Sequence, residues 1–210
     1  MIYRFVMTDK SKQAKAIVRI ERIHLEEDTA KLIHGDINGK KVSLIDFNRS
    51  DLPLIEIASK PDIKSPEQAY EYAKKIRETV RYLGIGDGDM EKGGMRLEAN
   101  ISLQTREQFD NGKLPDYKVE VKNINSFNYM KQAVDYEIIR QEKLLNNGEK
   151  ISQETRGFNS SKQVTFSQRS KENAADYRYF PDPDIPEIVF NSTQIGKWRK
   201  ELPPTQTAII

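Results

Sequence analysis

Four short polar clusters contain the side chains of this sequence that could do chemistry. They are His24–Asp28, Asp46–Arg49, Arg96–Asn100 and Lys118–Asn123. Most of them place a carboxylate beside a cation or an amide. Carboxylates are ligands that Mg²⁺ prefers, and neighbouring Arg or Lys side chains can neutralise a phosphate group. The clusters therefore indicate a surface that holds a divalent cation together with a polyanion.

The elements that must position these side chains are extended strands, because apolar and polar residues alternate through three of the clusters. In Met95–Leu103 the polar face carries Arg96, Glu98 and Asn100. In Tyr117–Lys122 it carries Glu120 and Lys122. A solvated sheet face with ordinary cross-strand ion pairs is the competing explanation for any one strand. The repetition of carboxylate, Arg and Asn across several strands favours the functional interpretation.

The first cluster follows the same alternation, which predicts that Ile23 and Leu25 face a core. His24 and Glu26 then fall on the opposite, polar face. Glu26 and Glu27 cannot both point at one ion from a regular strand unless a β-bulge intervenes, so one of them is expected to ligate directly. His24 could instead satisfy a hydrogen bond at a strand edge.

Composition places the chain among polar, soluble proteins that are long enough to bury a core. It has 210 residues, of which 31% are charged and 37% hydrophobic, and a mean hydropathy of −0.73. Neither a membrane span nor a signal peptide is evident, so a cytoplasmic location is expected. The absence of cysteine excludes disulfides and thiolate metal sites, and two histidines argue against a histidine-rich zinc site. A net charge of +2 is too small to identify a nucleic acid as the partner.

Two helices are predicted by their caps and by the helical spacing of apolar residues. The first begins at Ser65–Gln68, which supplies an N-cap, a proline at the first helical position and the glutamine of a capping box. It ends before Gly84. The second is capped by Ser126 and covers Phe127–Asn146. Together with the strands, they predict an α+β fold in which helices pack on an antiparallel or mixed sheet.

Turn signals separate these elements. Asn38-Gly39 predicts a hairpin turn before a strand over Lys41–Asn48, in which Asp46 could hold a turn rather than a metal. The glycine-rich acidic segment Gly84–Gly94 lacks the Lys-Ser/Thr ending of a phosphate-binding loop, so a turn is the better interpretation. Gln104–Asp116 is interpreted as a polar excursion between two strands.

Seven longer motifs extend these clusters and follow one another along the chain. They are H-L-E-E-D-x-x-K (24–31), D-F-N-R-x-x-x-P-L-I-E-I (46–57), S-P-E-x-A-Y (65–70), M-E-x-G-x-x-R-x-x-A-N (90–100), E-V-K-N-I-N-S-F (120–127), Q-E-T-R (153–156) and D-Y-R-Y-F-P-x-P-D (176–184). This order strongly resembles the GatB family, whose members are the GatB subunits of the aspartyl/glutamyl-tRNA amidotransferases. The resemblance runs from about Ile17 to Ile188, and so many ordered motifs make it highly specific.

The resemblance implies a glutamine-synthetase-like cradle within an ATP-dependent carbon–nitrogen ligase. ATP and Mg²⁺ would activate the side-chain carboxylate of Glu-tRNA(Gln) or Asp-tRNA(Asn), and ammonia derived from glutamine would then replace the phosphate. The implied partners are a GatA-like glutaminase subunit that delivers ammonia through a tunnel, a small GatC-like subunit and the misacylated tRNA, with no membrane. Such chemistry needs positioning and charge neutralisation rather than a side-chain nucleophile.

Carried onto this sequence, the resemblance assigns three overlapping groups of residues. The implied metal ligands are His24, Glu26, Glu27 and Glu120. The implied catalytic residues are Glu26, Glu27, Glu120 and Arg96. The implied cofactor-binding residues are Lys31, Asn48, Arg49, Glu98, Asn100, Lys122, Asn125 and Arg178. The cations among them would contact phosphates or the tRNA terminus, and the asparagines would orient these groups by hydrogen bonds.

The expected domains are a poorly specified lead-in over residues 1–13, a GatB-like catalytic cradle domain over 14–190 and the start of a connection over 191–210. The family usually begins with a further strand that bears a metal-binding Glu and His, and it continues into a helical and a tail domain. We expect the cradle to be incomplete at its N-terminus and the isolated chain to have little or no amidotransferase activity. A non-catalytic scaffold for tRNA or partner subunits and a generic RNA-binding domain are the alternatives, and the preference between Glu-tRNA and Asp-tRNA is left open.

Overall fold

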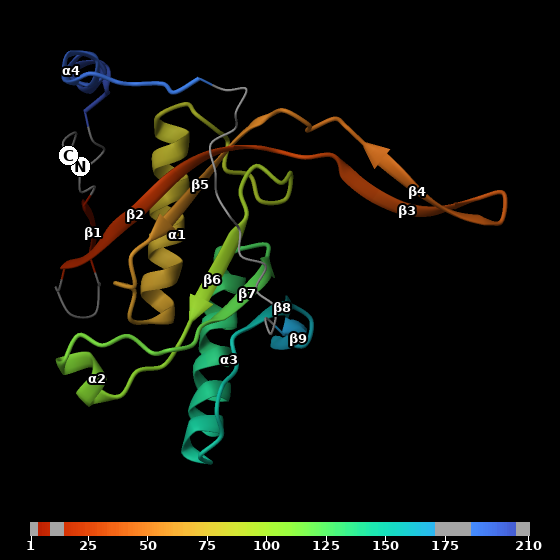
Figure 1. Cartoon of the computed structure of the whole chain (residues 1–210), viewed down its shortest axis with the longest axis vertical. Coiled ribbons are helices and arrows are strands. Elements are labelled where there is room, and N and C mark those ends of the chain that lie inside the picture. Colours follow the sequence, from red (N-terminus) through yellow and green to blue (C-terminus); the bar gives the residue numbers. More distant parts are fainter. Residues whose placement is uncertain (1–3, 9–14, 171–185, 205–210) are drawn as a thin grey trace.

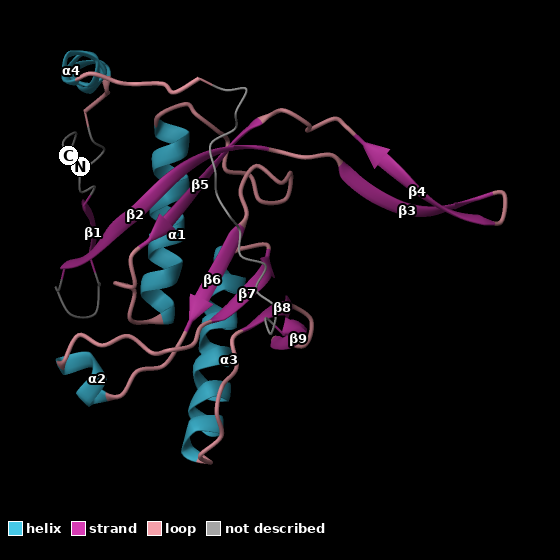
Figure 2. Ribbon diagram, in the orientation of Figure 1, coloured by secondary structure: helices cyan, strands magenta, loops and turns pink. Residues whose placement is uncertain are grey.

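The computed structural model describes residues 4–8, 15–170 and 186–204, and it confirms the predicted α+β fold (Figures 1 and 2). Its strands are β1 (Arg4–Thr8), β2 (Lys15–Glu27), β3 (Lys31–Ile37), β4 (Lys40–Asp46), β5 (Pro53–Ser59), β6 (Leu97–Ile101), β7 (Val119–Ile124), β8 (Glu154–Asn159) and β9 (Val164–Ser170). Its helices are α1 (Pro66–Tyr82), α2 (Arg106–Asp110), α3 (Phe127–Asn146) and α4 (Ser192–Glu201). Within these ranges no helix combines the length and the apolar character that crossing a membrane requires.

A four-stranded sheet in the order β6-β7-β8-β9 forms the main layer of the fold. β7 and β8 run parallel, whereas the other neighbouring strands are antiparallel. Helix α3 runs along this sheet and contacts β6, β7 and β9 (Figure 2). The core between the two layers contains apolar side chains at alternating strand positions and at helical spacing, including Val119, Val121, Ala133 and Phe158. Burial thus occupies one face of the sheet and leaves the opposite face for polar residues.

Helices α1 and α3 begin where their caps predicted. The hydroxyl of Ser65 accepts a hydrogen bond from the third helical N–H of α1 at 3.2 Å, and Ser126 does the same for α3 at 3.1 Å. The two helices pack against each other. The short helix α2, which has a capping box of Thr105 and Gln108, lies in the segment interpreted as a polar excursion. The sequence did not reveal it because five residues without an apolar stripe show no helical period.

Three strands in the order β1-β2-β5 form a second sheet. β1 lies in the segment predicted to be a poorly specified lead-in, and it pairs antiparallel with β2. Arg19 on β2 binds Asp62, in the loop before α1, through its Nε at 2.9 Å and its terminal nitrogen at 2.7 Å. This contact with the guanidinium holds the pKa of Asp62 below its ordinary value. The ion pair therefore ties β2 to the start of the first long helix.

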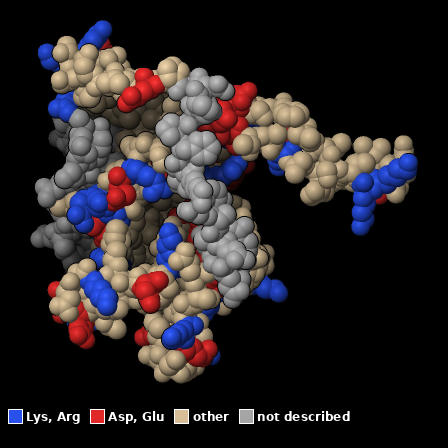
Figure 3. Space-filling model, viewed as in Figure 1, with Lys and Arg blue, Asp and Glu red and all other residues tan. Residues whose placement is uncertain are grey.

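β3 and β4 form a two-stranded hairpin that projects from the body of the molecule (Figure 1). Its turn is the predicted one, and Asn38 and Gly39 both adopt left-handed conformations with φ values of 53° and 74°. Large apolar side chains on the hairpin are exposed, among them Leu32 at 60% and Ile45 at 56%. In the face that Figure 3 displays, acidic and basic side chains are interspersed over the body, whereas much of the hairpin is uncharged.

One expectation about burial is wrong, because Ile23 and Leu25 on β2 do not face a core. Their exposed fractions are 55% and 77%. In the described part of the chain, the extensive contacts of β2 are with β1 and β5, so no helix packs over this apolar face. Alternation predicts which residues share a face of a strand. It does not predict whether another layer covers that face.

A buried carboxylate, that of Glu137 on α3, joins the helix to β8 and β9. Glu137 has an exposed fraction of 0% and pairs with Arg140 at 2.8 Å and with Arg156 at 3.1 Å. Burial opposes its ionisation, but hydrogen bonds from Arg140, Thr165 and a neighbouring glutamine outweigh burial and hold the pKa of Glu137 below its ordinary value. Arg156 also pairs with Glu154 at 2.8 Å. This network fixes β8 against the helix.

Candidate functional site

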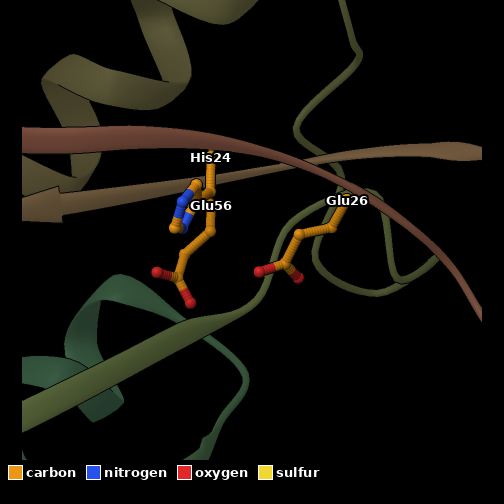
Figure 4. Close-up of side chains that lie close together, drawn as sticks. All are labelled: His24, Glu26 and Glu56. Carbon is orange, nitrogen blue, oxygen red and sulfur yellow. The ribbon is translucent and has the colours of Figure 1, made fainter. Parts of the chain in front are cut away.

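Three side chains of β2 and β5 meet and form what we name the β2–β5 cluster: His24, Glu26 and Glu56. Each offers one ligand atom, and these atoms all lie within 4.8 Å of one another. His24 and Glu26 are two positions apart on β2 and therefore share a face, while Glu56 is the direct partner of His24 on β5. Figure 4 shows the three side chains leaving the two strands on the same side. All three are exposed to solvent.

The donor set of the β2–β5 cluster fits a divalent cation. One imidazole nitrogen and two carboxylate oxygens suit Mn²⁺ or Zn²⁺, and carboxylates are the usual protein ligands of Mg²⁺. Mg²⁺ would complete its octahedral shell with waters and phosphate oxygens. Arg22 lies on the same strand face and pairs with Glu56 at 2.5 Å. The cluster is therefore a candidate metal site whose negative charge is partly neutralised by an arginine.

Glu56 is the member of the β2–β5 cluster that the sequence reasoning did not identify. It lies within a recognised motif and between two isoleucines, but only the register of β2 and β5 places it opposite His24. The same register pairs Glu27 with Pro53. The one irregularity in this strand pair lies between Ile20 and Arg22, several residues from Glu27. Glu27 therefore stays on the other face of a regular strand and outside the cluster.

Three predicted residues, Glu98, Glu120 and Lys122, meet on the polar face of the four-stranded sheet. Together with Thr155, which was not predicted as a site residue, we name them the sheet-face cluster. The Lys122 Nζ lies 3.3 Å from Glu98 Oε1 and 3.8 Å from Glu120 Oε1. Thr155 donates a hydrogen bond from Oγ1 to Glu120 Oε2 at 2.8 Å. Asn100, another predicted residue, stands opposite Glu120 on β6. The ammonium of Lys122, which lies between two carboxylates, can bind a phosphate group that is itself bound to a divalent cation.

A bulge in β7 directly follows Lys122, which shares the polar face with Glu120 by simple alternation. The register between β6 and β7 shifts by one residue, and Asn123 adopts a left-handed conformation with a φ of 63°. Asparagine tolerates this conformation better than most residues. As a result, Lys122 and Asn123 both lie outside the core, while Val121 and Ile124 on either side are buried.

The cluster around Asp46 and Arg49 builds a turn and a clamp. Asp46 Oδ1 accepts hydrogen bonds from the backbone N–H of Asn48 at 2.9 Å and from its side-chain amide at 2.6 Å. Asp46 thus holds a turn in this structure. Arg49 donates to Asp28 at 2.8 Å and to the carbonyl of Gly93 at 2.9 Å. Arg49 therefore ties the end of β2 to the glycine-rich loop that leads into β6.

The other predicted residues are not brought into either cluster. Lys31 begins the projecting hairpin, where it stands opposite Asp46. Arg96 is exposed directly before β6, and Asn125 is exposed directly before the cap of α3. Arg178 lies outside the described residues.

The two clusters come from different sheets. In Figures 1 and 4, the β2–β5 cluster lies on the side of its strands on which β6 passes. The structure groups Glu26 with Glu56, and it groups Glu120 with Glu98. A single cation shared by Glu26 and Glu120 therefore stays a prediction.

The chain is similar to known proteins over most of its length. Residues 5–196 match the family described as the GatB/GatE catalytic domain. The GatB subunits of aspartyl/glutamyl-tRNA(Asn/Gln) amidotransferases are 48% identical over 194 residues in Picosynechococcus and 50% identical over 187 residues in Dehalococcoides mccartyi. These alignments cover 91% and 89% of this chain, but 38% and 37% of the relatives, so the chain spans less than half of their length. On the family match, the chain belongs to the GatB/GatE catalytic domain family.

Proposed function

We propose that the chain supports the ATP- and Mg²⁺-dependent step of a tRNA-dependent amidotransferase, as part of its GatB subunit. A side-chain carboxylate oxygen of Glu-tRNA(Gln) or Asp-tRNA(Asn) attacks the terminal phosphorus of ATP, and ADP leaves. Ammonia released from glutamine then attacks the activated carbon, and phosphate leaves. The observation that carries the proposal is the meeting of His24, Glu26 and Glu56 in a chain of this family.

In this proposal the two clusters have different tasks. The β2–β5 cluster would hold the cation, which when bound would supply positive charge to the phosphate oxygens. On the sheet face, Lys122 supplies the positive charge that a phosphate requires. Before the phosphate binds, Glu98 and Glu120 hold the ammonium of Lys122 in place. Thr155 restrains one oxygen of Glu120, which leaves its orientation defined.

We also propose that the chain acts beside other subunits, because its relatives are described as one subunit of an amidotransferase. A glutaminase subunit would release the ammonia, a small third subunit would complete the assembly, and misacylated tRNA would be the acceptor in the cytoplasm. The catalytic fold would be a glutamine-synthetase-like cradle. Three observations support this proposal: the family match, the polar sheet face and the possible metal ligands of the β2–β5 cluster.

Isothermal titration with ATP and Mg²⁺ tests the proposal without the other subunits. We expect the wild type to bind, and we expect Glu26→Gln and Glu56→Gln each to bind about tenfold or more weakly, since loss of a metal-site residue has effects of this order. Glu142→Gln is the matched control, because this exposed glutamate on α3 lies outside both clusters. No binding by the wild type, or unchanged binding by both cluster variants, would contradict the proposal.

One observation favours a second function, that of a scaffold for partner subunits. The projecting hairpin exposes large apolar side chains, and an isolated two-stranded hairpin is marginally stable in water. A scaffold would bind its partner without nucleotide. Binding of a partner subunit that is unaffected by Mg²⁺-ATP, together with no nucleotide binding by the chain alone, would favour this function.

A further inference from the structure

An exposed aromatic ring lies on the polar face of the four-stranded sheet. Phe166 on β9 is 44% exposed. Its partner on β8 is Gly157, whose own partner on β7 is Lys122. Partners on neighbouring strands share a face, so the ring lies on the side of the sheet that carries the sheet-face cluster. The aromatic ring and the ammonium therefore belong to one row across three strands.

Gly157 shapes the place where the ring lies. A Cβ at this position would come within 2.5 Å of Phe166 Cζ and within 2.6 Å of Gln168 Nε2. The ring therefore packs down onto the backbone of β8, and the amide of Gln168 lies beside it. Covering a glycine with a cross-strand aromatic ring stabilises a sheet, which accounts for the packed side of Phe166. The exposed remainder of the ring is left to face a ligand.

The distance across the row suits a nucleotide. Neighbouring strands lie about 4.8 Å apart, so the backbones of β7 and β9 at Lys122 and Phe166 are roughly 10 Å apart. At one end, the ammonium of Lys122 lies near the carboxylates of Glu98 and Glu120. These carboxylates and a phosphate can bind the same divalent cation. The ring at the other end offers an apolar stacking face. A ligand that matches both ends has an aromatic base, a sugar and a polyphosphate.

We infer that Phe166 is the platform on which the purine base of ATP stacks, while Lys122 contacts its phosphates. The amide of Gln168 carries both a donor and an acceptor and lies beside the ring, where it can bind the edge of the base. This inference rests on the proposed function, because it places the nucleotide of that reaction. Stacking on an aromatic side chain is worth roughly 5- to 150-fold in affinity per base.

The test compares the binding of two probes, Mg²⁺-ATP and Mg²⁺-tripolyphosphate, by isothermal titration. Tripolyphosphate has the phosphates of ATP but no base. Phe166→Leu keeps an apolar side chain over Gly157 and removes the aromatic ring, and Phe166→Tyr restores a ring. Phe109→Leu is the matched control, because Phe109 on α2 is 49% exposed and lies outside the sheet. Thermal unfolding of each variant checks that it is folded.

We expect the wild type to bind ATP at least fivefold more tightly than tripolyphosphate. Phe166→Leu should lose this difference and bind tripolyphosphate like the wild type, whereas Phe166→Tyr and Phe109→Leu should retain it. Equal losses for both probes, or no loss for ATP, would overturn the stacking assignment and leave the proposed function intact. Failure of the wild type to bind either probe would overturn the proposed function and, with it, this inference.

Discussion

Replacing Glu137 with glutamine tests whether the buried ion network holds the four-stranded sheet to α3. The carboxylate is fully buried and contacts Arg140 at 2.8 Å and Arg156 at 3.1 Å. Removing one partner of a buried pair costs about 3–5 kcal/mol, because the remaining charge is left uncompensated. Glu154 still lies 2.8 Å from Arg156 and 3.5 Å from Arg140, so we expect the low end of this range, about 3 kcal/mol.

The same variant should change the response to acid. The pKa of Glu137 lies below its ordinary value in the folded chain. Its ionised form therefore stabilises the fold at neutral pH. This contribution is lost as the pH falls from the ordinary pKa of glutamate through the lower pKa of Glu137 in the folded chain. The difference in unfolding free energy between the wild type and Glu137→Gln should accordingly be largest near pH 7 and shrink below about pH 4.

Urea unfolding followed by circular dichroism at several pH values measures both effects. Glu142→Gln is the matched control, since it removes an exposed glutamate from the same helix and should change the unfolding free energy by less than about 0.5 kcal/mol. A loss below about 1 kcal/mol for Glu137→Gln, or a loss that does not depend on pH, would refute this account of the network.

Three further predictions concern the two clusters. Thr155→Val should weaken the binding of Mg²⁺-ATP about tenfold in isothermal titration, because it removes a hydrogen bond to the charged Glu120, and Thr155→Ser should restore binding. Arg22→Ala should raise the affinity for Mn²⁺ by about two- to fivefold in electron paramagnetic resonance titrations, because Arg22 and the cation compete for Glu56. The gain is small because an exposed ion pair such as Arg22–Glu56 is worth at most about 1 kcal/mol. Asn123→Ala should lower the free energy of unfolding in urea by about 1 kcal/mol, whereas Asn123→Gly should not, because only the alanine is strained at this φ; equal effects would contradict the bulge argument.

Local signals in the sequence predicted the local elements of the fold. Ser65 and Ser126 mark the starts of α1 and α3 because a cap is a contact between residues three apart. Asn38-Gly39 marks the hairpin turn because few residue pairs accept two left-handed conformations. Alternation likewise placed His24 with Glu26, since side chains two apart on a strand share a face.

The sequence by itself determined these elements, the polar face of each strand and, through its ordered motifs, the family. Only the tertiary structure decided that Glu56 joins His24 and that Thr155 joins Glu120, because each contact depends on which strand lies beside which and in what register. It also decided that Glu137 lies in the buried stripe of α3 and that Ile23 and Leu25 are exposed. Periodicity describes the faces of one element, whereas burial and ligand geometry depend on elements far apart in the chain.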